Sequence, residues 1–123
     1  PTSITDAYAM MKVMSQQYGT SHFKLIVNMV ASEAEAKKVY ASLSGALDRF
    51  LKNVVLEYAG YIPMDRQLQM AVQKRGLIMD SAPDSSAAKA LEKIAQQLMN
   101  SPVQERSNGN LTFFMNRIFQ PVN

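Results

Sequence analysis

The pattern of apolar and polar positions predicts a β–α–β unit between residues 23 and 65. Residues 23–30 are nearly all apolar, which is typical of a strand buried on both faces of a parallel sheet. Residues 33–51 have apolar side chains at helical spacing, and residues 54–61 form a second apolar run. Because a long helix connects the two strands, they are expected to be parallel, with a right-handed crossover.

Polar residues mark the ends of both predicted strands. Asn28 lies at the end of the first apolar run, and Pro63, Met64 and Asp65 follow the second. Ligands of open α/β sheets bind outside the carboxyl ends of the strands. The sequence therefore places a candidate ligand-binding rim at Asn28 and at residues 63–65.

Two helices are predicted in and before this unit. The first begins near Ser3 and Asp6 and stops at Gly19, a residue type favoured at helix C-termini. The second begins with a capping box formed by Ser32 and Glu35. At 100° per residue its inward arc is predicted to hold Val39, Tyr40, Leu43, Ala46, Leu47, Phe50 and Leu51.

Further helices are predicted after the unit. Pro63 lacks an N–H and ends strand pairing, while Asp65 is placed to cap a short helix that Gly76 closes. Residues 77–79 are expected to form a short extended segment, and an amphipathic helix follows and ends near residue 100. At most three strands result, so we expect an incomplete parallel sheet with an open apolar edge.

Composition excludes several classes of function. With 123 residues the chain suits a single domain, and with no Cys it has neither disulfides nor thiolate metal sites. No apolar run approaches the roughly 18 residues that span a bilayer, and no signal peptide is visible. His22, the only histidine, is expected in a surface loop. Since the chain begins with Pro1 rather than Met, we expect a piece of a longer protein.

Three motifs, at residues 1–12, 27–30 and 60–65, occur in the order and spacing of a known family. They read PTSITDAYAMMK, VNMV and GYIPMD, with Ala71 and Val72 following the last. Over about residues 1–100 the chain resembles the C-terminal half of the MinD/ParA-type ATPases, most nearly the FlhG/FleN group of flagellar-number regulators. The resemblance implies an α/β fold with a partial Rossmann-like parallel sheet flanked by helices. This would be the C-terminal half of a P-loop NTPase of the SIMIBI class.

The resemblance implies a role for the rim in binding ATP or ADP. The Asn28 amide would hydrogen-bond the adenine edge, since an amide supplies both a donor and an acceptor. Pro63, Met64 and Asp65 would wall the base, with backbone groups making the polar contacts. The alternatives are an Asx turn at Asn28 and a strand stop with a helix cap at residues 63–65.

The phosphate side of such a site is missing from the sequence. It contains no Gly-x-x-x-x-Gly-Lys-Ser/Thr loop and no acidic strand end to hold Mg²⁺. In the resembling family these parts lie upstream of the segment that matches this chain. We therefore expect no catalytic residue here, and expect the chain alone neither to hydrolyse ATP nor to hold it tightly.

The last segment changes character. Residues 101–110 are polar with Pro and Gly and predict a linker, and residues 111–120 predict a short amphipathic helix. Its apolar face holds Leu111, Phe114, Met115, Ile118 and Phe119. Burying these side chains gives about 1.5–3 kcal/mol each, against about 1–2 kcal/mol per ordered backbone residue, so a single copy binds a membrane marginally. The alternative is a helix that docks on its own domain.

By resemblance, the parent protein regulates flagellar number and placement by ATP-dependent dimerisation and reversible binding to the inner face of the cell membrane. Its partners would be a second copy, an FlhF-type GTPase, flagellar switch-complex proteins and the flagellar transcription activator. Two rival classes stay open. One is a non-enzymatic interaction module that uses the sheet edge and C-terminal helix. The other is a ParA-like partition ATPase acting on DNA, which the mixed charges of helix 33–51 and the mild net charge of +3 disfavour.

Overall fold

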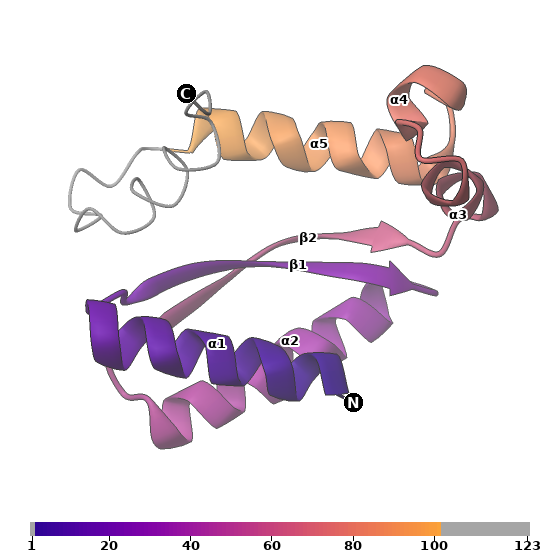
Figure 1. Cartoon of the computed structure of the whole chain (residues 1–123). Coiled ribbons are helices and arrows are strands. Elements are labelled where there is room, and N and C mark those ends of the chain that lie inside the picture. The colour runs from indigo at the N-terminus through magenta and orange to yellow at the C-terminus, as the bar shows by residue number, and fades with distance from the viewer. Residues whose placement is uncertain (1, 102–123) are drawn as a thin grey trace.

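The computed structural model describes residues 2–101 as an α/β fold, a two-stranded sheet between two layers of helices (Figure 1). The elements follow in the order α1 (Thr2–Tyr18), β1 (His22–Val30), α2 (Glu33–Phe50), β2 (Val55–Pro63), α3 (Arg66–Gln73), α4 (Ile78–Ser81) and α5 (Ser86–Asn100). Helices α1 and α2 cover one face of the sheet and α5 lies over the other (Figure 1). This is the partial Rossmann-like arrangement that the sequence predicts.

The two strands pair in parallel, as the β–α–β pattern predicts. His22 lies opposite Val55 at one end, and Val30 lies opposite Pro63 at the other. The register shifts twice, between Leu25 and Ile26 and between Asn28 and Val30. The second irregularity falls on the predicted ligand-binding rim.

Helix α2 begins with the predicted capping box. The Ser32 hydroxyl accepts the N–H of Glu35 at 3.2 Å, and the Glu35 carboxylate accepts the N–H of Ala31 at 3.0 Å. Leu43 and Leu47 on its inner face are each only 1% exposed. The prediction that Phe50 faces inward is wrong, because this residue lies at the border of the apolar arc and is 64% exposed. Its ring instead packs edge-on against Tyr8 of α1, with centroids 6.5 Å apart.

The core is divided by the sheet. Under α1 and α2 the buried side chains are Met11, Leu43, Leu47, Leu51, Val54 and Leu56. Across the sheet the buried side chains belong to β2 and the last three helices, namely Ile62, Ala71, Ile78, Ala87, Ala88 and Ile94. A smaller cluster of Val27, Val30 and Ala36 joins β1 to the start of α2. The helices beyond β2 thus have a core of their own, anchored on Ile62.

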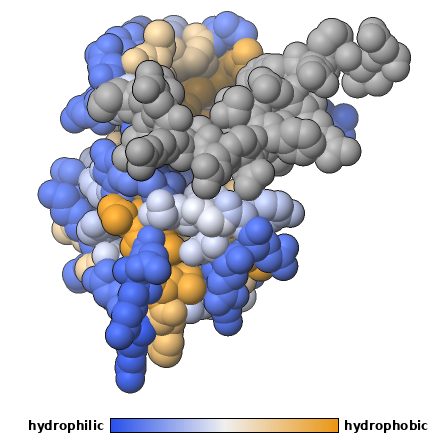
Figure 2. All heavy atoms as spheres, turned by 90° about the vertical axis from the view of Figure 1, so that its left-hand side faces the viewer, coloured by the Kyte–Doolittle hydropathy of each residue, from blue (hydrophilic) through white to orange (hydrophobic). Residues whose placement is uncertain are grey.

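Strand β1 is more exposed than its apolar sequence predicts. Only Val27 and Val30 are buried, whereas Ile26 is 40% and Met29 is 49% exposed. The reason is that α5 packs on β2 and leaves the same face of β1 open. Within residues 2–101 each strand pairs only with the other, so both outer edges lack a strand partner, as expected. Seen from the end at which β1 begins, apolar groups form a narrow band between polar residues (Figure 2).

Two local predictions fail. Residues 77–79 form no third strand, because only Leu77 is extended and Ile78 begins α4. Ile78 is 5% exposed in the cluster formed with α3 and α5, which explains why this apolar stretch packs as a helix. His22 is the first residue of β1 rather than a loop residue, and its Nε2 lies 3.1 Å from the Glu57 carboxylate of β2.

Candidate functional site at the strand ends

The parallel register brings the two halves of the predicted rim together. Asn28 lies opposite Ile62, and Val30 lies opposite Pro63, so both strands end at the same border of the sheet. The N–H of Met64 donates to the carbonyl oxygen of Val30 at 2.9 Å and ties the two ends to each other. The rim is therefore one continuous feature, built from residues more than 30 positions apart.

Asn28 offers a free amide at this rim. It is exposed, it lies within β1 rather than after it, and its side chain has no hydrogen-bond partner in the described part of the chain. The Asx turn that the sequence allowed is not formed. The next residue, Met29, has a φ of 59°, in the left-handed region that costs a non-glycine residue about 1–2 kcal/mol. Such local strain is found where the surrounding structure fixes a functional geometry.

Asp65 uses its carboxylate inside the protein. Oδ1 accepts the N–H of Gln67 at 2.8 Å and caps α3. Oδ2 accepts the N–H of Ala87 at 2.9 Å and the Ser86 hydroxyl at 3.2 Å, at the start of α5. The Ala87 N–H, then that of Gln67, holds the pKa of Asp65 below its usual value, since each favours the charged form. The carboxylate thus has the helix-capping role, which is the alternative that the sequence allowed for this residue.

The rest of the loop is apolar. Pro63 is the last residue of β2, and Met64 is 60% exposed beyond it. A proline ring and a flexible thioether present the kind of adaptable apolar surface that packs against a planar ring. Together with the Asn28 amide, the rim combines an apolar wall with one neutral donor and acceptor pair.

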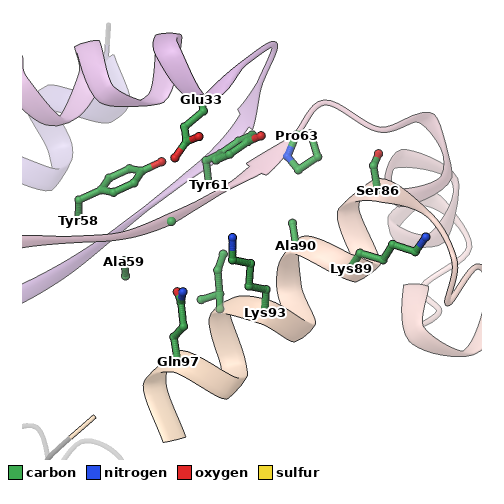
Figure 3. Close-up of a pocket in the computed structure, with 12 residues that line it drawn as sticks. Glu33, Tyr58, Ala59, Tyr61, Pro63, Ser86, Lys89, Ala90, Lys93 and Gln97 are labelled. Atoms are coloured by element: carbon green, nitrogen blue, oxygen red, sulfur yellow. The ribbon is translucent and has the colours of Figure 1, made fainter. Parts of the chain in front are cut away.

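A cavity of about 550 Å³ lies beside this rim, between β2 and α5 (Figure 3). It is lined by Glu33, Tyr58, Ala59, Gly60, Tyr61, Pro63, Ser86, Lys89, Ala90, Lys93, Ile94 and Gln97. Of the four predicted rim residues only Pro63 reaches it. The sequence did not reveal this cavity, because its walls come from three separate elements that share no motif.

Tyr58 is the buried polar group of that cavity. Its ring packs edge-on against Tyr40 with centroids 5.8 Å apart, and its hydroxyl is buried with no hydrogen-bond partner among residues 2–101. Burial raises the pKa of the Tyr58 phenol, and the nearby Glu33 and Tyr61 raise it further. The hydroxyl therefore stays protonated and keeps a donor available.

The remaining sequence predictions fall partly outside the structure. The predicted membrane-binding residues Leu111, Phe114, Met115, Ile118 and Phe119 lie beyond the described range, as does nearly all of the predicted linker. Within residues 2–101, no three His, Asp or Glu side chains cluster as a metal site would require. No helix in the same range is both long and apolar enough to cross a bilayer.

Comparison with known proteins identifies relatives along nearly the whole chain. The antiactivator FleN of Pseudomonas aeruginosa is 38% identical over 120 residues, which cover 98% of this chain and 42% of that protein. The flagellum site-determining protein YlxH of Helicobacter pylori is 30% identical over 100 residues, covering 81% of this chain and 33% of that protein. No family model matches the chain.

The fold and these matches define the class of protein. The chain belongs to the MinD/ParA-like family, which confirms the resemblance of its three motifs. Within that family it belongs to the FlhG/FleN group. It spans less than half the length of the two relatives that it matches.

Proposed function

We propose that this chain supplies the adenine side of the nucleotide site in a flagellum-regulating ATPase. The observation that carries the proposal is the exposed and unpartnered Asn28 amide beside the Pro63–Met64 loop, at the carboxyl ends of two parallel strands. An amide can donate to and accept from the edge of adenine, and the loop offers an apolar wall with backbone polar groups. The residues present fit the base of ATP or ADP.

The phosphates and Mg²⁺ would be held by another part of the parent protein. Bound Mg²⁺ and ATP would supply the charge and the hydrolysable bond, while this chain would orient the base. Asn28 would set the position of the base and Met64 would cover it. The chain alone is expected to bind ATP weakly at best, because much of the affinity for nucleotides comes from phosphate contacts.

The proposed cycle couples ATP binding to dimerisation and membrane attachment. A single amphipathic segment at residues 111–120 binds a bilayer marginally, whereas two copies held in one dimer gain from effective concentration. The protein would then be cytoplasmic and reversibly peripheral to the inner face of the cell membrane. Proposed partners are a second copy, an FlhF-type GTPase, flagellar switch-complex proteins and the flagellar transcription activator, without direct contact to nucleic acid.

The nucleotide proposal is tested on the chain extended upstream to the length of its relatives. Calorimetric titration with ATP and Mg²⁺ should show saturable binding, and light scattering should show a dimer that forms with ATP and not without it. If ATP neither binds nor changes the molecular mass, the nucleotide proposal fails. A non-enzymatic interaction module would then explain the partnerless strand edges better.

The membrane proposal is tested by co-sedimentation with liposomes of anionic composition. The extended chain should pellet with the liposomes when ATP is present, and removal of residues 110–123 should abolish pelleting. Phe114→Glu should have the same effect, while Phe113→Glu is the matched control because it lies off the predicted apolar face. Equal pelleting of all forms would contradict the membrane proposal.

A further inference from the structure

The cavity beside α5 follows the free edge of β2. Four consecutive residues of β2, from Tyr58 to Tyr61, line it. Successive residues of a strand point to opposite faces of the sheet. Consecutive residues of β2 can therefore line the same cavity only if the cavity extends around the edge of the strand. Because β2 pairs only with β1 in the described part of the chain, this edge presents unpaired backbone groups to the cavity.

The handedness of the fold leaves this edge at the border of the sheet. Helices α1 and α2 cover the same face (Figure 1). Right-handed crossovers through helices on one face add strands in one direction. A strand that preceded α1 would therefore lie beyond β1, on the side away from β2. The edge of β2 is thus distinct from the edge at which upstream strands would continue the sheet.

The two walls of the groove have opposite charge. On the α5 wall Lys93 extends toward β2, and Lys89 lies one turn away along the same flank (Figure 3). On the α2 wall the Glu33 carboxylate lies between the rings of Tyr58 and Tyr61 (Figure 3). Glu33 is also 3.7 Å from the Lys37 ammonium, but this exposed pair is weak and leaves the carboxylate available.

We propose that the β2 edge binds an extended peptide as an additional strand, with acidic side chains toward α5 and a basic side chain toward Glu33. A bound strand would direct alternate side chains to the two walls, which is why the opposite charges select an alternating pattern. The groove runs from Ser86 to Gln97 along α5, roughly 16 Å at the rise of a helix, which matches about five residues of a strand.

The chain's own C-terminal segment is a poor match for this groove. Residues 102–123 contain one acidic residue, Glu105, and two basic residues, Arg106 and Arg117. They have no alternating acidic positions to place against Lys89 and Lys93. The charge pattern therefore favours a peptide from another protein over the segment that follows α5.

The test uses the full 123-residue chain and a blocked seven-residue probe peptide. The probe has glutamate at its odd positions, and valine, arginine and valine at its even positions. Fluorescence polarisation should show saturable binding without nucleotide, so the result is independent of the adenine proposal. Hydrogen exchange should show new protection of the backbone amides between residues 58 and 62 that point away from β1. Two further probes carry N-methyl groups on alternate amides, in the two possible registers, and each blocks strand pairing along one edge of the peptide. One of the two should lose binding, because its methylated edge is the one that faces β2.

Charge variants test the two walls. Lys93→Glu should weaken binding of the glutamate probe about tenfold. A probe whose glutamates are replaced by lysine should bind the unmodified chain poorly and the Lys93→Glu variant better. Lys12→Glu on α1 is the matched control, because Lys12 is also exposed and α1 covers the face of the sheet opposite to α5 (Figure 1), so this change should leave binding unaltered. Glu33→Gln should weaken binding of the arginine probe and not that of a probe with valine at the centre.

Several results would overturn the proposal. The first is no saturable binding of the probe, and the second is binding that survives N-methylation in both registers. Equal binding of the charge-reversed probe to the unmodified chain would also overturn it. Protection of the amides between residues 58 and 62 that point away from β1, before any probe is added, would show that the C-terminal segment occupies the edge. Protection that grows with protein concentration would show that a second copy does.

Discussion

The Asp65 carboxylate accepts the backbone N–H of Ala87 at 2.9 Å, so the residue that ends the β2 loop also begins α5. The other oxygen caps α3 through Gln67. One side chain therefore fixes two helix N-termini relative to the end of a strand. Because this strand end carries the proposed adenine wall, the capping role of Asp65 makes it a positioning residue for the rim.

Replacing Asp65 should loosen both helices. Asp65→Ala removes the N-cap of α3 and the acceptor of the Ala87 N–H, although Ser85 still caps α5. It is expected to lower the melting temperature by about 5 °C, the size that a lost cap has in a domain of this length. Asp65→Asn should have a smaller effect, because its single amide oxygen can cap one helix but not both. Thermal unfolding followed by circular dichroism measures both changes. An Asp65→Ala variant with an unchanged melting temperature would contradict the double-cap role.

The same contacts predict a pH dependence. The backbone N–H groups of Ala87 and Gln67 lower the pKa of Asp65 in the folded protein below its usual value. Its contribution to stability is therefore fully present above the pKa of the unfolded chain, and it is lost as the pH falls through the lower, folded pKa. The stability difference between the unmodified chain and Asp65→Asn should be constant near neutral pH and shrink below about pH 4. Denaturant titrations at several pH values would detect this, and a difference that grows in acid would contradict it.

Gly60 allows α5 to approach the sheet. It has a φ of +144°, and a Cβ built there would lie 2.9 Å from Cγ1 of Ile94. Gly60→Ala should therefore destabilise the chain by about 1–3 kcal/mol, through backbone strain and displacement of α5. Gly45→Ala is the matched control, since nothing lies within 4 Å of its added Cβ in α2 and the change should stabilise by about 0.5–1 kcal/mol. Urea unfolding should show that the free energy of unfolding falls in Gly60→Ala and rises in Gly45→Ala. Equal changes in the two variants would be inconsistent with this packing.

The features that the sequence predicted are those governed by local chemistry. The β–α–β order follows from apolar periodicity, and the Ser32–Glu35 capping box from spacing alone. The features that it missed depend on contacts between distant residues. Asp65 reaches Ala87 across 22 positions, and the apolar stretch at Ile78 became a helix because the cluster with α3 and α5 was available to bury it.

The rim and the cavity show the same difference between features set by local sequence and features set by distant contacts. The rim could be predicted because parallel strands must end at one border of a sheet. The cavity could not, because Glu33, Tyr58 and Lys93 meet only after β2 and α5 have packed. The end of α3 is a subtler case, since Arg75 rather than Gly76 adopts the left-handed conformation, with a φ of 54°. Glycine is favoured at that position but is not required, so the sequence predicts the helix stop at Gly76, one residue too late.

Replacing Met29 with glycine should stabilise the chain. Its φ of 59° is unstrained for glycine, so Met29→Gly is expected to stabilise the chain by about 0.5–1 kcal/mol after the entropy cost of glycine is included. Met29→Val should destabilise it, because a β-branched side chain tolerates this region least. Urea unfolding of both variants provides the measurement. If glycine destabilises as much as valine, the exposed Met29 side chain contributes more to stability than its backbone strain costs.

Asn28 should affect nucleotide binding without affecting stability. Its side chain is exposed and has no partner within residues 2–101, so Asn28→Ala should change the free energy of unfolding by less than about 0.5 kcal/mol. In the chain extended to the length of its relatives, the same variant should bind ATP about tenfold more weakly, because it loses a hydrogen-bond donor and an acceptor to the base. Asn28→Asp should also bind ATP more weakly than the unmodified protein, since a carboxylate keeps the acceptor and loses the donor. Asn53→Ala, the same change in the exposed turn before β2, should leave both quantities unaltered. Calorimetry with ATP measures the affinities, and an Asn28→Ala variant that binds ATP as tightly as the unmodified protein would place the base elsewhere.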